Sequence, residues 1–456
     1  MVKCPKTTFA RPPPGAPPQF AMPTLRTVTL GCKVNQYETE FVREGLLAAG
    51  YADARRGEAA DLCVVNTCTV THEGDAKSRQ TIRRLAKDNP AARIVVMGCY
   101  ATRAPNEVAA LPGVAEVVSD KRELPDLLGR MGVVDVPDGI SNFAGHHRAF
   151  IKVQDGCLLR CSFCIIPHVR PNLASRPVDA IVREAERLLV AGFRELVLTG
   201  IHLGHYGVDF NRGRAKNGWQ RLSHLLARLM EILEHPDGGP FRVRLSSIEA
   251  TEVTRELLDV MAAHPRRICP HLHVSMQSGS DGVLRRMRRR WGAQRFIDRC
   301  RLAQQTLDLP ALTTDIIVGF PDETEAEFAE TCQVVEELGF SKIHIFPFSP
   351  RRGTPAAEMT NQVAPEAKAD RVRRLRELES KTRRRYHQQL LGRTLDVLVQ
   401  APADRPGYVC GTACRYAPVE LPGKMDLESQ IVAARAIATD GERIRAGFLN
   451  AERTRR

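Results

Sequence analysis

The sequence lacks any long apolar run. No stretch approaches the roughly 18 consecutive apolar residues that a membrane-spanning helix needs, and residues 1–23 contain no apolar h-region of a secretory signal. These absences predict a cytoplasmic protein with no membrane partner. The first 23 residues are instead rich in proline, which predicts a disordered leader.

A secretory signal is missing, so the thirteen cysteines of the chain favour metal or cluster ligation in a reducing cytoplasm over disulfides. A length of 456 residues exceeds what one core supports and predicts several domains. The net charge of +13 and the pI near 9.3 favour a polyanionic partner, nucleic acid first.

Residues 24–135 alternate short β-branched runs with helical segments, which predicts an open parallel α/β domain of the Rossmann-like kind. Cys32, Cys68 and Cys99 each follow one of its predicted strands. The carboxyl ends of parallel strands share one edge of a sheet, so these thiols can converge although they are far apart in sequence. The alternative is that each is a small buried core residue.

Residues 145–385 contain six further strand and helix units, which predict an open, partial (β/α)6 barrel of the TIM type. This range ends in a long basic helix at 365–389. Residues 388–453 change to short strands punctuated by Gly and Pro, which predicts a small all-β barrel. Cys410 and Cys414 of this segment have no third partner and are interpreted as structural.

Cys157, Cys161 and Cys164 stand in one loop with the spacing C-x3-C-x2-C, directly after the first predicted barrel strand. Three thiolates so close can bind three irons of an iron-sulfur cube and leave one iron without a protein ligand. A zinc knuckle with His168 as its fourth ligand is one alternative, and a group of buried free thiols is another.

The loop resembles that of the radical S-adenosylmethionine (SAM) enzymes. Gly156 and Phe163 also stand where those enzymes have a glycine and an aromatic residue. With the three dispersed cysteines and the β-rich tail, residues 25–450 resemble a radical SAM methylthiotransferase with a TRAM domain at its C-terminus. The segments LGCKVNQYETE, NTCTVT, GDAKSRQTIRRL and GCYATRAP resemble the subgroup that acts on N6-threonylcarbamoyladenosine in tRNA.

That resemblance implies two 4Fe-4S clusters and SAM as cofactors. The loop cysteines would hold the cluster that cleaves SAM to a 5'-deoxyadenosyl radical, and Cys32, Cys68 and Cys99 would hold an auxiliary cluster where sulfur is added. Two SAM molecules would be used per product, one for the methyl group and one to remove hydrogen from carbon 2 of the adenine. The positions carried over for SAM binding are Phe163, Thr199, Gly200, Ser247, Glu249 and Gln277.

The implied partners are tRNA, an electron donor such as flavodoxin or ferredoxin, and a sulfur donor. Lys33, Val34, Asn35 and Gln36 differ between subgroups and are predicted to set substrate choice; the alternative is an ordinary helix start capped by Asn35. Asp315 and Gly319 are expected to close the SAM pocket. Other readings are the same chemistry on isopentenyladenosine or ribosomal protein S12, a non-enzymatic iron-sulfur RNA-binding protein, and an electron carrier.

Two basic stretches are candidate phosphate contacts, the run Arg285–Arg290 and the helix 365–389. The alternative is a solvated face in which Glu377 and Glu379 pair with nearby arginines. The predicted RNA contacts are Arg285, Arg288, Arg373, Arg374, Arg383 and Arg384. One local departure from the family pattern follows the cluster loop, where Val169, Pro171 and Ala174 replace alanine, glycine and arginine; the proline removes a donor and fixes the chain.

Overall fold

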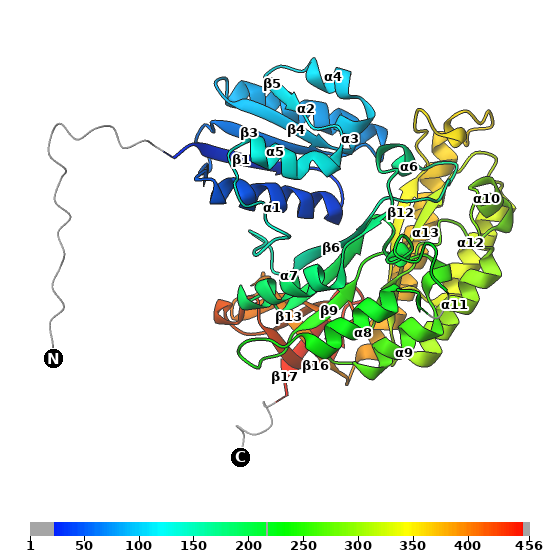
Figure 1. The fold of residues 1–456 in the computed structure, drawn as a ribbon. Coiled ribbons are helices and arrows are strands. Elements are labelled where there is room, and N and C mark those ends of the chain that lie inside the picture. The colour runs from blue at the N-terminus through cyan, green and yellow to red at the C-terminus, as the bar shows by residue number, and fades with distance from the viewer. Residues whose placement is uncertain (1–21, 216–217, 450–456) are drawn as a thin grey trace, which may run out of the picture.

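The computed structural model describes residues 22–215 and 218–449, and Figure 1 shows their three parts in chain order. An α/β unit precedes a central barrel of parallel strands, and a small all-β barrel follows. The predicted fold class is confirmed. Residues 1–21 of the predicted proline-rich leader, including Cys4, lie outside the described residues. No helix in the described ranges is both long enough and apolar enough to cross a membrane.

The N-terminal unit is an all-parallel sheet in the order β2-β1-β3-β4-β5. Its strands are β1 (Thr24–Thr29), β2 (Ala52–Asp53), β3 (Leu62–Thr67), β4 (Arg93–Gly98) and β5 (Val114–Val117). Every residue of β3 is buried, as expected for a central strand covered on both faces. The helices are α1 (Lys33–Ala48), α2 (His72–Asp88), α3 (Cys99–Arg103), α4 (Pro105–Ala109) and α5 (Leu124–Arg130). The short strand β2 was not predicted.

The central part has six parallel strands in sequence order: β6 (Ala149–Asp155), β8 (Glu195–Gly200), β9 (Arg242–Leu245), β10 (His271–His273), β11 (Ala311–Val318) and β12 (Lys342–Pro347). Two ladders, β6-β8-β9 and β10-β11-β12, are joined by isolated parallel bridges. No pairing within the described part of the chain joins β12 back to β6. The barrel is therefore open at the β12 edge, as the sequence predicted.

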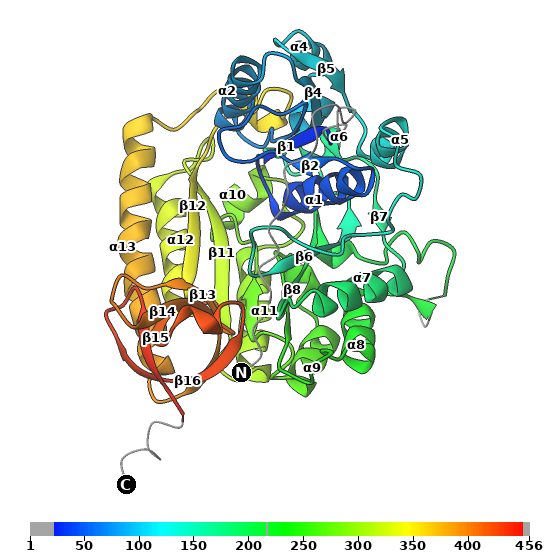
Figure 2. The same cartoon turned by 90° about the vertical axis from the view of Figure 1, so that its left-hand side faces the viewer.

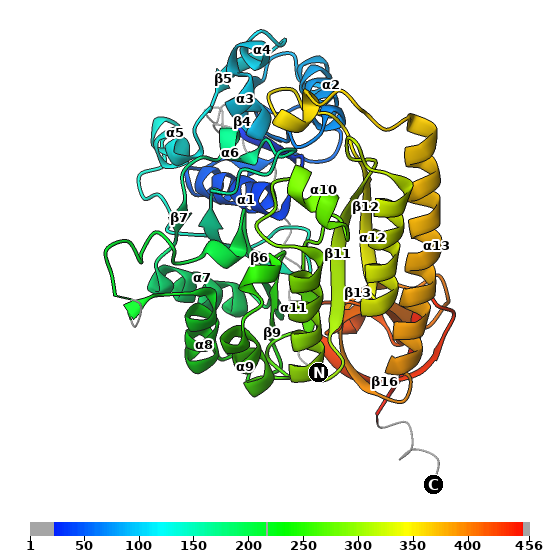
Figure 3. The same cartoon turned by 90° about the vertical axis from the view of Figure 1, so that its right-hand side faces the viewer.

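Helices cover the outer face of this partial barrel (Figure 3). They are α7 (Val178–Val190), α8 (Leu222–Ile232), α9 (Arg255–Ala263), α11 (Ala293–Thr306) and α12 (Glu325–Leu338). Two short helices, α6 (Ile166–Val169) and α10 (Asp281–Arg286), follow β6 and β10 in the chain. A two-residue strand, β7 (Ala174–Ser175), pairs antiparallel with the end of β6. This pairing holds the end of the segment Val169–Ala174, which departs from the family pattern, against the barrel.

The long helix α13 (Pro365–Leu390) runs along β12 to the C-terminal barrel (Figure 2). That barrel is closed in the order β13-β14-β15-β17-β16. Its strands are β13 (Thr394–Pro402), β14 (Tyr408–Ala413), β15 (Pro418–Pro422), β16 (Ile431–Thr439) and β17 (Ile444–Phe448). Alternate residues of the strands form its apolar core.

The C-terminal barrel is fixed to the lower, amino-terminal ends of the central strands by two buried arginines. Arg242 donates to the carbonyl oxygens of Asp396 (2.6 Å) and Thr412 (2.9 Å), and Arg244 donates to that of Cys414 (3.1 Å). Both arginines also bond the buried carboxylate of Glu195, so their charges are compensated. The N-terminal sheet therefore lies at one end of the central strands and the closed barrel at the other (Figure 2).

Candidate active site

The loop with three cysteines leaves the carboxyl end of β6 through a glycine that no other residue could replace without a shift. Gly156 has φ +76°, and a Cβ there would lie 2.0 Å from the carbonyl oxygen of Asn172. The amide of Cys157 then donates to the carbonyl of Arg170 (3.3 Å), and that of Cys164 to the carbonyl of Cys161 (3.1 Å). The loop is thereby folded back on itself at the mouth of the barrel.

A cavity of about 160 Å³ lies against this loop. Its lining includes most of the residues that the sequence proposed for the cluster and for SAM, and also His202 and Arg289, which it did not propose for this pocket: Cys157, Cys161, Phe163, Cys164, His202, Ser247, Glu249, Gln277 and Arg289. Thr199 and Gly200 end β8 but do not line the cavity. Thr199 is buried, and Gly200 packs against Gln154.

Two further residues that the sequence placed at this pocket, Asp315 and Gly319, do not line the cavity. Asp315 lies inside β11 beside His273, and only its backbone carbonyl reaches the pocket residues, accepting from the amide of Gln277 (2.8 Å). Gly319 faces α13, where a Cβ would lie 2.3 Å from the side chain of Lys368. The sequence showed that both residues lie in or just after the fifth barrel strand. It could not show which way each residue faces, because that depends on how the strand packs against its neighbours.

Arg289 is the site residue that sequence reasoning placed elsewhere. It belongs to the basic run interpreted as phosphate contacts, yet its side chain is only 3 % exposed. It pairs with Glu249 and donates to Cys161 Sγ (3.6 Å), and Trp291 also donates to Glu249 (3.1 Å). Glu249 is therefore bound by protein groups, and one arginine of the run faces inward because the chain turns there; the preceding Arg288 has φ +59°.

Arg289→Met should weaken iron retention at the loop cysteines. The change leaves the Glu249 carboxylate beside Cys161 without its cationic partner, and like charges disfavour a thiolate. Loss of iron to a chelator should become about 10- to 100-fold faster, the usual effect of removing such a supporting contact. The exposed neighbour gives a matched control, Arg290→Met, and adding Glu249→Gln should restore retention. Equal rates for Arg289→Met and the control would contradict this role.

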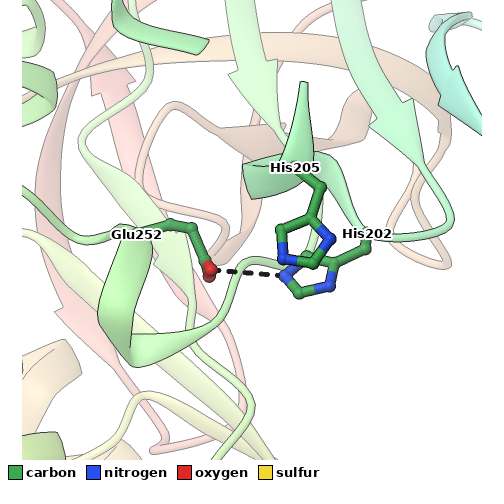
Figure 4. Close-up of side chains that lie close together, drawn as sticks. All are labelled: His202, His205 and Glu252. Atoms are coloured by element: carbon green, nitrogen blue, oxygen red, sulfur yellow. Dashed lines mark ion pairs between the residues drawn. The ribbon is translucent and has the colours of Figure 1, made fainter. Parts of the chain in front are cut away.

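A second missed residue, His202, lies just after β8 and contacts the loop. Figure 4 shows its ring stacked on that of His205 and beside Glu252. Its Nδ1 lies 3.7 Å from Cys157 Sγ and its Nε2 lies 3.4 Å from Glu252, while the ring stacks on His205 at 3.6 Å. Burial opposes its charging, but the contacts with Cys157 and Glu252 raise the pKa of His202 to about 9. Burial and the neighbouring His202 charge lower the pKa of His205 to about 4. The two shifts are opposite in direction, so they favour charge on His202 over charge on His205.

The three dispersed cysteines meet at the carboxyl edge of the N-terminal sheet. Cys32 precedes α1, Cys68 follows β3 and Cys99 begins α3 directly after β4. Gly31 has φ +103°, and a Cβ there would lie 3.1 Å from Cys68 Sγ. Burial raises the pKa of Cys32 and Cys68, and the Cys99 thiol beside them adds to both shifts. The three thiols therefore lie together at one edge of the sheet, as predicted from their positions after parallel strands.

Asn35 supports this loop and does not cap α1. The helix begins at Lys33 with Cys32 at the capping position, and no side chain caps it. The Asn35 amide donates to the carbonyls of Leu30 (2.9 Å) and Thr67 (3.1 Å), which ties the turns after β1 and β3 together. The capping alternative is wrong, and Asn35 instead fixes the spacing between Cys32 and Cys68.

The two cysteine sites lie on either side of one small apolar contact. Cys99 packs against Ile165 and Val169, which belong to the segment just after the cluster loop. The next residue, Arg170, donates both guanidinium nitrogens to Glu38 of α1 (2.7 Å each) and also bonds Asp155 (2.9 Å). The altered segment Val169–Ala174 thus joins the N-terminal unit to the barrel.

The donor sets fit the groups that the sequence predicted. Each site brings three thiols together, which suits an iron-sulfur cube with one iron open. His168, the zinc alternative, lies on α6 and lines a different cavity, on the far side of Cys161 and Cys164. Burial raises the pKa of the Cys164 thiol to about 12, so loading of this site must release protons.

The predicted RNA contacts divide into two groups. Arg285, Arg288 and Arg384 are exposed, and no ion pair of theirs is found in residues 22–215 and 218–449. Arg373 pairs with Asp370 and Glu377, Arg374 with Glu325, and Arg383 with Glu379 and Glu442. The side chain of Arg383 is only 12 % exposed, so it holds α13 against the C-terminal barrel.

An open barrel of parallel strands with three thiols after its first strand defines a radical SAM protein, and family models agree. Residues 151–335 match the Radical SAM superfamily, and residues 24–119 match a family described as Uncharacterized protein family UPF0004. A radical SAM methyltransferase, TsrM, from Kitasatospora setae shares the fold, with a TM-score of 0.54 over 73 % of this chain and 75 % of that one at 14 % identity.

Curated relatives narrow the class. Threonylcarbamoyladenosine tRNA methylthiotransferase MtaB of Bacillus subtilis is 38 % identical over 91 % of this chain and 94 % of the relative, and that of Thermotoga maritima is 35 % identical over 92 % and 96 %. A tRNA-2-methylthio-N(6)-dimethylallyladenosine synthase of Corynebacterium efficiens is 33 % identical over 84 % and 75 %. The chain belongs to the MtaB family of radical SAM methylthiotransferases.

Proposed function

We propose that the protein adds a methylthio group to carbon 2 of N6-threonylcarbamoyladenosine in tRNA. The observation that carries this conclusion is the meeting of two three-thiol sites across the contact of Cys99 with Ile165 and Val169. One site can serve a radical source and the other a sulfur carrier, and a substrate carbon placed between them can reach both. An electron carrier or a binding protein has no need of this juxtaposition.

When bound, the clusters and SAM supply the radical and the sulfur. The chain's own residues do the rest. Arg289 directs an N–H group at Cys161, and a ring nitrogen of His202 contacts Cys157, which orients two ligands of the loop site. Ile201, Ile248 and Phe163 give the cavity apolar walls that limit water. Ser247 and Gln277 offer the polar groups that a carboxylate or ribose of SAM requires.

The RNA would be held by the exposed face around the barrel mouth and by the C-terminal barrel. Arg288 lines a cavity together with Cys161 and Cys164 of the cluster loop, Arg285 precedes it by three residues, and Arg384 lies beside the C-terminal barrel, where it contacts Gly441. Exposed arginines without acidic partners suit phosphate contacts. The adenine must leave its stack to reach the cavity, which costs least in a loop of the RNA. The electron donor, of the flavodoxin or ferredoxin kind, and the sulfur donor are further partners of this proposal.

Nucleoside analysis tests the substrate directly. In cells that lack the gene, mass spectrometry of digested tRNA should show N6-threonylcarbamoyladenosine without its 2-methylthio derivative, and the intact gene should restore the derivative. A gene carrying Cys99→Ala should not restore it. Loss of the methylthio form of isopentenyladenosine, or of modified aspartate in ribosomal protein S12, would instead identify a different substrate for the same chemistry.

A further inference from the structure

Two histidines and a carboxylate lie together on the inner face of the open barrel edge. They come from three neighbouring strands, His273 from β10, Asp315 from β11 and His344 from β12, and are called the inner-face triad below. Their neighbours along the strands pack into the main core on the opposite face: Leu272, Ile316 and Ile343. Side chains alternate between the two faces of a sheet, so the triad faces the barrel interior. Its ligand atoms all lie within 4.8 Å of one another.

The spacing of the inner-face triad matches that of ligands around one metal ion. Zinc binds imidazole and carboxylate at about 2.0–2.2 Å with tetrahedral angles, which places ligand atoms about 3.3 Å apart and two imidazole ring centres about 5 Å apart. Nε2 of His273 lies 3.1 Å from Oδ2 of Asp315. The rings of His273 and His344 lie 5.5 Å apart, with 46° between their planes. His344 is exposed, so its side chain has room to turn toward the other two ligands.

The other side of the His273 ring is already held by a hydroxyl group. Thr313 Oγ1 lies 2.9 Å from Nδ1 of His273 and 3.1 Å from Nε2 of the buried His271. Histidines that bind metal usually have such a partner on the second ring nitrogen, because it fixes the orientation of the ring. Nε2 of His273 is thereby left for the side on which Asp315 lies.

A second group of two histidines and a carboxylate does not have this spacing (Figure 4). The rings of His202 and His205 stack 3.6 Å apart and only 18° from parallel, which is closer than two imidazoles on one ion. His202 also contacts Cys157 of the cluster loop (3.7 Å). By contrast, no member of the inner-face triad lines the cavity at that loop. A metal ion at the triad would therefore be separate from both three-thiol sites.

We infer that the inner-face triad binds a zinc ion with one coordination position open toward the barrel interior. Two histidines and one carboxylate are a ligand set of catalytic zinc sites, in which water or a substrate oxygen takes the fourth position. Asp315 has a side chain that is 25 % exposed, and His344 is exposed, so the site can be reached from the open edge. The open position would take an oxygen anion that enters the barrel. This site does not depend on the proposed function.

Zinc binding to the cluster-loaded protein tests the site. The iron content is first brought to about eight per chain, so that both cysteine sites are filled. Zinc is then added in anaerobic equilibrium dialysis and measured together with the iron. The wild-type protein should bind one zinc ion per chain. His344→Phe and Asp315→Asn should each weaken zinc binding by at least about 10- to 100-fold, the range for losing even a contact that supports a ligand.

X-ray absorption at the zinc edge identifies the ligands. Nitrogen and oxygen at about 2.0–2.2 Å are expected, whereas sulfur at about 2.3 Å would place the zinc at the cysteines. The matched control is His224→Phe, an exposed histidine that pairs with Glu256 (2.9 Å) but belongs to no such group among the described residues. It should bind zinc as the wild type does. The site is refuted if the wild-type protein binds no zinc, if the zinc has sulfur ligands, or if His344→Phe binds zinc as tightly as the control.

Discussion

Cys99→Ala should abolish methylthiolation while the protein still forms 5'-deoxyadenosine from SAM under reducing conditions. Cys157→Ala should abolish both. The reason is the division between the two sites: Cys32, Cys68 and Cys99 converge at the sheet edge, and Cys157 belongs to the separate loop after β6. Each variant should fall from about eight irons per chain to about four after anaerobic reconstitution, because each loses one cube.

The control for this experiment is Cys332→Ala, which changes a half-buried cysteine on α12 far in sequence from both sites. It should keep the iron content and both activities of the parent. The division of roles is wrong if Cys99→Ala loses 5'-deoxyadenosine formation as completely as Cys157→Ala, or if it retains all of its iron.

Arg170→Met should destabilise the protein by about 3–5 kcal/mol, the usual cost of removing one member of a buried ion pair. Arg170 is fully buried and binds Glu38 with both nitrogens, and Lys152 also reaches Glu38 (2.8 Å). A matched control is Arg183→Met, whose ion pair with Asp138 is about half exposed and should contribute at most about 1 kcal/mol. Urea unfolding, followed by a probe on the N-terminal unit, measures both changes.

The same ion-pair network should make the stability of the folded protein fall at acid pH. Burial by itself would raise the pKa of Glu38, but Arg170 and Lys152 outweigh burial and hold it at about 2, below its ordinary value of 4.5. A lowered pKa stabilises the folded state at pH values above 4.5, and this stability is lost as the pH falls from 4.5 toward 2. Arg170→Met should remove much of this pH dependence. An unchanged unfolding midpoint in Arg170→Met would show that the network is not the joint between the two units.

Short-range patterns were sufficient for much of the molecule. The strand and helix periods predicted the N-terminal parallel sheet, the open barrel and the closed C-terminal barrel, because each element of these must show a buried face in its own residues. The loop cysteines were recognisable because they lie within eight residues of one another. The strand-end rule also predicted that Cys32, Cys68 and Cys99 meet, since it follows from the direction of parallel strands alone.

The partners of charged side chains were decided only by the tertiary structure. The sequence grouped Arg289 with its basic neighbours, yet a turn in the chain directs it to Glu249 and Cys161. Arg383 was expected to face RNA and instead joins α13 to the C-terminal barrel.

The sequence alone therefore determined the three-part fold and the two sets of three thiols, because both follow from local periodicity and strand direction. The tertiary structure decided how the two sites are joined and supported. Arg170 meets Glu38 across 132 residues of sequence, and His202 meets Cys157 across 45. No periodicity encodes such contacts, because which arginine or histidine reaches a given carboxylate or thiol depends on how the finished elements pack.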